Sequence, residues 1–255
     1  EKPYRLPLYN KRTKPIKLAA GSEPAGDKLD KMPSRYYQRT YLEGGYYHLY
    51  NRGTHKQTIF RDNDDYFTFT EILSYYLRFP HGKPHSRFSP KNEPDGSSSS
   101  ESTPCHLLCY CLMPNHFHLL LKQILFPAQI DSPTNLMRRL SITYSMYFND
   151  KYQHSGNLFQ GKFKNVPVDS KSQLLHLTKY IHRNPLALLA GSEPATLESY
   201  IYSSYSDYLG PTNRNWVKPN EILSYFSSKN PLLSYRAFIE EKEDLLSINH
   251  LILDD

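Results

Sequence analysis

The sequence lacks long apolar runs, and this absence argues against an integral membrane protein. The longest apolar stretch, around residues 107–113, is far shorter than the roughly 20 residues that a membrane-spanning helix needs. Residues 1–18 mix Lys, Arg and Pro and contain no apolar stretch of the kind found in secretory signals. We therefore expect a soluble, intracellular protein without a membrane partner.

Cysteine is also scarce. Cys105, Cys109 and Cys111 are an odd number of thiols crowded into one short segment, which excludes a disulfide framework and agrees with a reducing compartment. Basic residues, in contrast, exceed acidic ones, and the formal net charge is +6. Such an excess suits a polyanionic partner, because Lys and Arg release counterions when they bind phosphates.

The composition changes along the chain indicate three regions. Residues 1–38 are rich in proline and basic in their first half, which predicts an extended arm. Residues 39–190 hold the apolar periodicity of a single core, interrupted at 80–104 by a flexible insertion rich in Pro, Gly and Ser. Residues 191–255 contain short helical patterns, and we expect them to form an appendage packed on the core.

Apolar periodicity and turn residues predict strands and helices in a definite order. The elements are a strand at 46–50, a helix at 62–78, strands at 105–112 and 116–121, a helix at 132–149, a strand at 161–168 and a helix at 171–184. This β-α-β-β-α-β order followed by a helix predicts an α+β protein with a ferredoxin-like, split βαβ fold. Its antiparallel sheet would have helices on one face, with the small helical appendage added.

Two short motifs carry residues suited to chemistry. His116 and His118 flank Phe117, and alternate residues on a strand share a face, so both imidazoles can converge on one metal ion. Tyr180 and Asn184 are four residues apart on a predicted helix and therefore share a helix face. Taken alone, each motif also fits ordinary packing or a helix end before a proline.

Six blocks in one order make the chain resemble a known family. They are YHLYNRG at 47–53, IF and DY at 59–60 and 65–66, MPNHFHL at 113–119, GNLFQGKF at 156–163, YIHRNP at 180–185 and SSYSDYLG at 203–210. With these blocks the chain resembles the IS200-like Y1 transposases of the HUH nuclease superfamily, most closely the REP-associated tyrosine transposases. The long insertion and the extensions at both ends depart from the family pattern and leave the recognised DNA open.

The resemblance implies roles for the residues at matching positions. His116 and His118 would be paired metal ligands, Asn184 the third ligand of Mg²⁺ or Mn²⁺, and Tyr180 the nucleophile. The implied activity is nicking and joining of single-stranded DNA that contains a hairpin, through a 5′-phosphotyrosine intermediate. A free phenol titrates near about pH 10, so such a nucleophile needs activation by a metal or a base. The implied setting is the cytoplasm or nucleoid of a prokaryote, with the protein as a monomer or homodimer.

Basic residues near these motifs are candidates for contacts with DNA phosphates. They are Arg52, Arg138, Arg139, Lys162, Lys164 and Arg183. For each of them, a solvated surface charge is an equally good reading.

Three other functions fit parts of the sequence. The first is a zinc module built from the three cysteines with His106, His116 and His118, although no C-x-x-C pair is present. The second is a DNA-binding protein that keeps the fold without cleaving. The third is a replication initiator or relaxase, which shares the paired-histidine site but places it among other motifs.

Overall fold

A computed structural model describes residues 41–80, 103–124, 133–189, 196–210 and 214–241. The predicted arm at 1–38 and nearly all of the predicted insertion at 80–104 lie outside these ranges. Within them, no helix combines the length and the apolar character needed to cross a bilayer.

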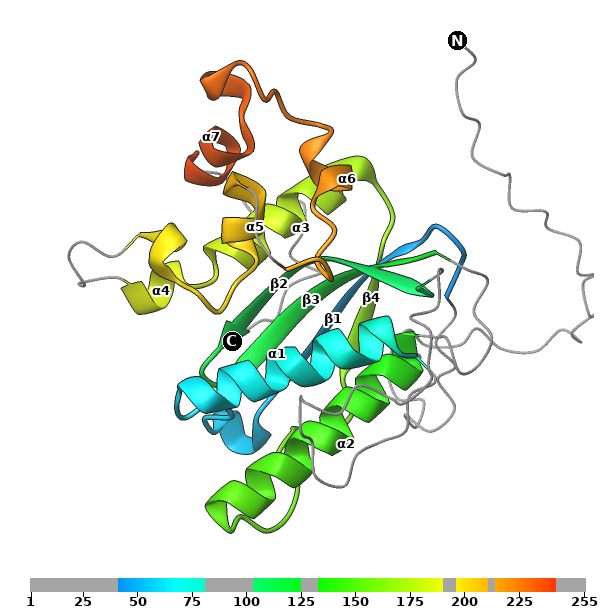
Figure 1. The fold of residues 1–255 in the computed structure, drawn as a ribbon, viewed down its shortest axis with the longest axis vertical. Coiled ribbons are helices and arrows are strands. Elements are labelled where there is room, and N and C mark those ends of the chain that lie inside the picture. Colours follow the sequence, from blue (N-terminus) through cyan, green and yellow to red (C-terminus); the bar gives the residue numbers. More distant parts are fainter. Residues whose placement is uncertain (1–40, 81–102, 125–132, 190–195, 211–213, 242–255) are drawn as a thin grey trace, which may run out of the picture. The chain divides into compact units, whose positions relative to one another are not determined.

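A four-stranded antiparallel sheet forms the centre of the described chain (Figure 1). Its strands are β1 (Tyr46–Arg52), β2 (Cys105–Met113), β3 (His116–Gln123) and β4 (Lys164–Val168), in the spatial order β2-β3-β1-β4. All neighbouring strands are antiparallel. This order, with one helix between β1 and β2 and another between β3 and β4, confirms the predicted ferredoxin-like fold.

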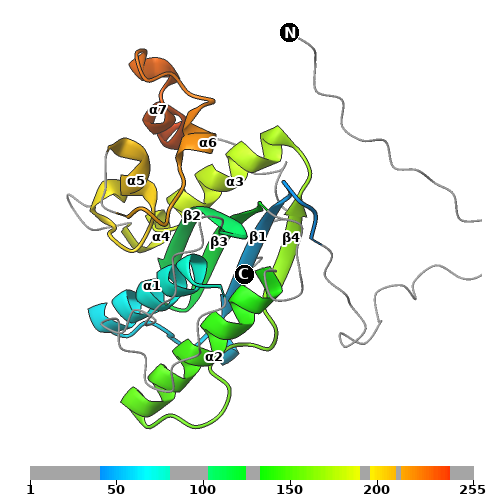
Figure 2. The ribbon, with the colours of Figure 1, turned by 45° about the vertical axis from the view of Figure 1, so that its right-hand side comes forward.

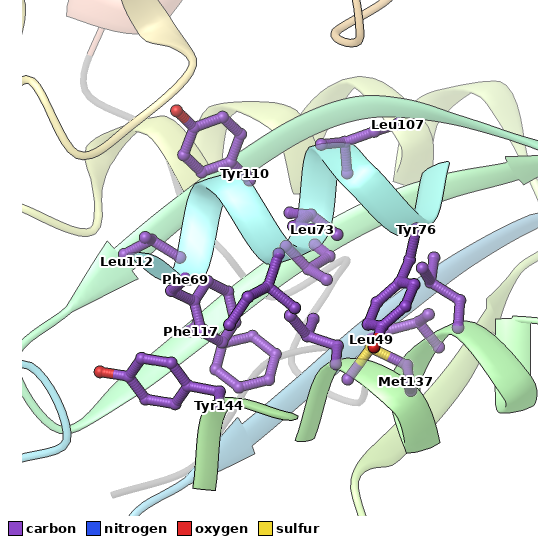
Figure 3. Packing of buried hydrophobic residues seen from close by; sticks show 14 of the residues in the cluster. Leu49, Phe69, Leu73, Tyr76, Leu107, Tyr110, Leu112, Phe117, Met137 and Tyr144 are labelled. Atoms are coloured by element: carbon purple, nitrogen blue, oxygen red, sulfur yellow. The ribbon is translucent and has the colours of Figure 1, made fainter. Parts of the chain in front are cut away.

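Helices α1 (Asn63–Arg78) and α2 (Pro133–Tyr152) cover one face of the sheet (Figures 1 and 2). The α1 helix begins where the Asp62 carboxylate accepts a hydrogen bond from the Asp65 amide, at 3.1 Å. An aromatic core joins the layers: the Phe69 ring lies 4.9 Å from Phe117 of β3 and 5.0 Å from Tyr144 of α2 (Figure 3). The two long helices thus bury the face of the sheet that carries Phe117.

The opposite face carries a second apolar layer. It consists of α3 (Lys171–Arg183) together with α5 (Tyr205–Leu209), α6 (Asn220–Leu223) and α7 (Tyr235–Glu240). Shorter turns complete the described chain: η3 (Thr54–Lys56), α4 (Leu186–Leu189), η5 (Leu197–Ser199) and η6 (Pro231–Leu233). The prediction of helices on one face was therefore incomplete, because α3 and the C-terminal pieces cover the second face, with Leu120 of β3 and Tyr208 of α5 in the same core.

Each edge of the sheet has its own protection. Along β2, the Leu112 amide donates to the Tyr202 carbonyl at 3.0 Å, and the Lys218 amide donates to the Leu107 carbonyl at 2.8 Å. At the other edge, β4 is only five residues long and contains Pro167, which has no amide proton to donate.

A buried carboxylate fastens α1 to α2. The Asp65 side chain is fully buried and accepts hydrogen bonds from the Lys151 ammonium at 2.9 Å and from the Tyr147 and Tyr152 hydroxyls at 3.0 and 2.8 Å. It also accepts from the Arg61 amide at 2.7 Å. These bonds join the start of α1 to the last turns of α2.

Replacing Asp65 with Ala should lower the free energy of unfolding by about 1–3 kcal/mol, because the Arg61 amide and the Tyr147 hydroxyl lose this acceptor, whereas Lys151 and Tyr152 keep the exposed Asp62. Glu198→Ala is the matched comparison, since Glu198 forms an exposed ion pair with Arg236 and should cost less than about 1 kcal/mol. Urea unfolding of both variants measures the difference. Equal losses would contradict the importance assigned to the buried carboxylate.

Candidate active site

Strand β3 presents its two histidines on the face that α3 covers. Phe117, between them, lies in the aromatic core on the other face. The register pairs His116 with Arg52 and His118 with Tyr50, so these side chains share one face of the sheet. His116 is half-buried at the start of the strand, whereas His118 is fully buried.

Helix α3 brings Tyr180 and Asn184 to the same face. The helix begins where the Ser170 hydroxyl accepts from the Gln173 amide at 3.2 Å and ends at Arg183, before Pro185. Leu174, Leu177 and Ile181 are buried in the core, which fixes the rotation of the helix about its axis. Tyr180 then lies at the margin of the buried stripe, and Asn184 caps the helix.

The four residues that the sequence predicted for the site lie together. The Nε2 atom of His116 is 3.3 Å from Oδ1 of Asn184. The His116 and His118 rings are 5.0 Å apart between centres, and the His118 ring is 5.4 Å from the Tyr180 ring, edge to face. Two residues of one strand and two of one helix therefore surround a common point.

Asn115 determines which nitrogen of His116 carries the proton. The Asn115 amide nitrogen donates to the Lys56 carbonyl at 3.3 Å, so its oxygen is the atom that lies 2.7 Å from Nδ1 of His116. That oxygen can only accept, and Nδ1 therefore carries the proton. In the neutral imidazole, Nε2 then directs a lone pair at the oxygen of Asn184. A cation bound between these two atoms would receive a lone pair from each of them.

His118 places a second imidazole nitrogen beside the site. Burial lowers the pKa of His118 well below its ordinary value, and the charges of His48, His116 and Arg52 lower it further, so the imidazole is neutral at pH 7. Among the described residues, its Nε2 atom is buried without a hydrogen-bond partner. An unpaired buried polar atom costs about 1–3 kcal/mol, and a functional site is one reason for a protein to keep it.

The three atoms fit a divalent cation. All three would be neutral donors: an amide oxygen is a usual ligand of Mg²⁺ and Mn²⁺, and imidazole nitrogens are more usual ligands of the later transition metals. The described residues hold no cluster of three or more His, Cys, Asp and Glu side chains suited to a metal. A three-ligand site at this place would therefore have to include the amide of Asn184.

The predicted phosphate-binding residues divide into two groups. Arg52 lies opposite His116 on β1, and Lys164 lies opposite Tyr50 on β4, so both point to the face of the site; Lys162, just before β4, is exposed. Arg138 and Arg139 belong to α2, on the other side of the sheet.

Two of these basic residues are engaged in structural contacts. Arg139 is 9% exposed, its guanidinium lies 4.0 Å from the centre of the Tyr76 ring, and it donates to the Pro80 carbonyl. Arg183 donates to the carbonyls of Ile239 and Glu241 at the end of α7. Both guanidinium groups thus contribute to packing between elements.

The three cysteines of the alternative zinc module are buried and make ordinary core contacts. Cys109 and Cys111 are fully buried in the apolar layer beside α3, and burial raises the pKa of both thiols. Cys105 donates to the Gln123 side chain at 3.3 Å, and Cys111 donates to the Met113 sulfur at 3.8 Å. The cysteines therefore act as small core residues.

Two buried histidines complete the surroundings of the site. His182 of α3 contacts the Tyr235 hydroxyl through Nδ1 at 2.6 Å and the Ser204 hydroxyl through Nε2 at 2.8 Å, so both of its ring nitrogens are engaged in the core. His48 of β1 contacts Nδ1 of His118 at 2.9 Å. Nothing in the sequence marks this contact, apart from the place of His48 in the first block.

Residues 97–184 match the model of the family described as IS200-like transposases. The matched stretch contains β2, β3, α2, β4 and α3, with His116, His118, Tyr180 and Asn184 among its residues. The match confirms the family resemblance predicted from the sequence blocks, and it supports a transposase-like, DNA-processing function. No curated protein matches the chain in sequence.

Two solved structures resemble the chain at low sequence identity. A REP-associated tyrosine transposase bound to a REP hairpin is 13% identical and aligns over 72% of this chain and 88% of its own, with a TM-score of 0.45. A candidate transposase from Deinococcus radiodurans R1 is 15% identical and aligns over 58% of this chain and 95% of its own, with a TM-score of 0.35.

The buried His182 should make stability depend on pH. Burial, aided by the charge of Arg214, lowers the pKa of His182 to about 3, whereas an unfolded histidine titrates near about 6.5. The stability that comes from the low pKa of His182 is fully present above about pH 6.5. It is lost as the pH falls, by up to about 1.4 kcal/mol per pH unit, because only the unfolded chain takes up the proton. His182→Gln should flatten this slope by one proton in urea unfolding between pH 7.5 and 5.

The exposed His55 provides the control for this measurement. It has a positive φ of 52°, which Asn tolerates, so His55→Asn should leave the slope unchanged. His118 is buried in both the His182→Gln and the His55→Asn variant, so its contribution to the slope cancels when the two variants are compared. An unaltered slope in the His182 variant would contradict the assignment.

Proposed function

We propose that this chain is a metal-dependent endonuclease and strand transferase for single-stranded DNA, with Tyr180 as its nucleophile. One observation carries the proposal: Tyr180 and Asn184 of α3 converge with His116 and His118 of β3. We assign the reaction to residues 39–190, whose described part contains all four side chains.

His116, His118 and Asn184 would hold Mg²⁺ or Mn²⁺ through Nε2, Nε2 and Oδ1. Such a cation, when bound, polarises a phosphate and neutralises the charge that develops on it. All three ligands are neutral, so they leave the full positive charge for the phosphate. His116 and Asn184 are half-buried, and the DNA phosphate would approach from their side of the site.

The chemical step is a transesterification. The Tyr180 oxygen attacks the scissile phosphorus and forms a phosphotyrosine bond while the bond to the 3′-oxygen breaks. The phenol loses its proton, and the departing 3′-oxygen gains one. The 5′-phosphate remains linked to Tyr180, so a second 3′-hydroxyl can attack the same phosphorus, restore the phenol and join two strands without ATP.

The DNA partner that the resemblance implies is a single strand next to a hairpin. Arg52 and Lys164 support a strand path over the site, because they lie on the same face of the sheet as the histidine pair. Lys162 extends this basic group. Contacts of this kind position the backbone and do not read the base sequence. A place in the cytoplasm or nucleoid, as monomer or homodimer, is consistent with this partner.

Replacing Tyr180 with Phe should abolish the covalent protein–DNA adduct while leaving DNA affinity nearly unchanged, because only the attacking oxygen is removed. The assay is incubation of the full chain with labelled hairpin-bearing single strands and Mg²⁺ or Mn²⁺, followed by denaturing electrophoresis. Chelation with EDTA should abolish the adduct of the unmodified protein.

Tyr50→Phe is the matched control, since the Tyr50 ring lies 5.8 Å from His118 and the Tyr180 ring lies 5.4 Å from it. This variant should keep forming adducts. Adducts that persist in Tyr180→Phe and vanish in Tyr50→Phe would identify Tyr50 as the nucleophile. Hairpin binding without any adduct in the unmodified protein would favour a DNA-binding protein that does not cleave.

Arg52→Ala and Lys164→Ala should each weaken DNA binding and reduce its salt dependence. Each lost phosphate contact with a single strand makes the slope of log affinity against log salt shallower by about 0.7. Arg138→Ala is the control, because Arg138 is an exposed residue of α2 beyond the other face of the sheet. Fluorescence anisotropy at several salt concentrations measures the slopes, and a larger loss in the Arg138 variant would refute this path.

A further inference from the structure

His48 lies beneath the candidate metal site without belonging to its ligands. It is fully buried in the central strand β1, opposite Leu120 of β3 and Val166 of β4. Its ring stacks on His118, with 5.1 Å between centres and 23° between planes. Its Nε2 atom lies 2.9 Å from Nδ1 of His118, so one of these two nitrogens carries the shared proton.

The position of that proton decides whether His118 can bind a cation. A neutral imidazole has one protonated nitrogen and one lone pair. If His48 donated, the proton of His118 would be on Nε2, the buried atom that has no acceptor among the described residues. If His48 accepts, the proton of His118 is on Nδ1, and the Nε2 lone pair points toward the site. The second arrangement gives the N–H group of His118 an acceptor and leaves none of the N–H groups of His118 buried and unpaired.

We propose that His48 is a positioning residue that accepts the Nδ1 proton of His118 and thereby holds the Nε2 lone pair of His118 toward the cation. The inference rests on the proposed function, because it concerns the same cation site. Outer partners of ligand histidines fix the tautomer and the ring orientation in this way.

The pairing of His48 with His118 resembles that of Asn115 with His116. In both cases a neutral acceptor, an imidazole nitrogen in one and an amide oxygen in the other, lies within 2.9 Å of Nδ1 of the ligand histidine. Carboxylates are frequent in this position, and a carboxylate would add a negative charge next to the cation. Neutral partners orient both rings and keep the positive charge available for a phosphate.

Three variants of the full chain separate this role from packing. His48→Phe keeps an aromatic ring and removes the acceptor, so Mn²⁺ affinity should fall about 10- to 100-fold. His48→Gln places an amide oxygen near the position of Nε2 and should restore most of the affinity. Val166→Ala removes packing beside His48 without altering any imidazole, and should leave the affinity unchanged. Mn²⁺ binding is followed by electron paramagnetic resonance, with circular dichroism melting to verify folding.

A second measurement needs no metal. Long-range ¹H–¹⁵N correlation spectra of the metal-free protein distinguish imidazoles protonated on Nδ1 from those protonated on Nε2, and the His118 signals are identified by their loss in His118→Gln. The expected result is His118 protonated on Nδ1. His118 protonated on Nε2 would overturn the proposal, as would a folded His48→Phe variant that binds Mn²⁺ with unchanged affinity.

The two proposals fail in different ways. If the unmodified protein binds no Mn²⁺, the cation site itself is refuted, and the role of His48 falls with it. If the unmodified protein binds Mn²⁺ and forms adducts while His48→Phe binds equally well, only the role of His48 is refuted.

Discussion

The antiparallel pairing of β1 with β3 is the constraint on which the candidate site depends. The register of these central strands places Tyr50 beside His118 and Arg52 beside His116. A slip of one residue would turn both imidazoles into the aromatic core and bring Phe117 to the site. The same packing that stabilises the sheet therefore determines which atoms face the cation position.

The other half of the site depends on the C-terminal layer. Tyr180 and Asn184 belong to α3, which packs against that layer through two side chains. His182 contacts Ser204 and Tyr235. Arg183 donates to the carbonyls at the end of α7. Ser204 in turn contacts the backbone of Tyr110 in β2. The C-terminal segment thus influences the placement of Tyr180 without contributing a side chain to the candidate site.

The sequence predicted the order of strands and helices because apolar periodicity reports local burial. It also predicted that His116 lies beside His118 and that Tyr180 shares a face with Asn184, since both pairs follow from the geometry of one strand or one helix. The contact between His48 and His118 joins positions 70 residues apart, and only the strand register brings them together. The burial of Arg139 could not be predicted either, because the sequence does not distinguish a basic side chain that packs in the core from one that is exposed to solvent.

Both edges of the described sheet are poor templates for the addition of a strand from another polypeptide. The outer backbone groups of β2 are already engaged by residues 202–204 and 217–218, while β4 is short and lacks one donor at Pro167. An incoming strand from another polypeptide would find no continuous ladder on either side. Within the described part of the chain, edge-to-edge pairing between copies would therefore meet an occupied β2 edge or a five-residue β4 edge that contains a proline.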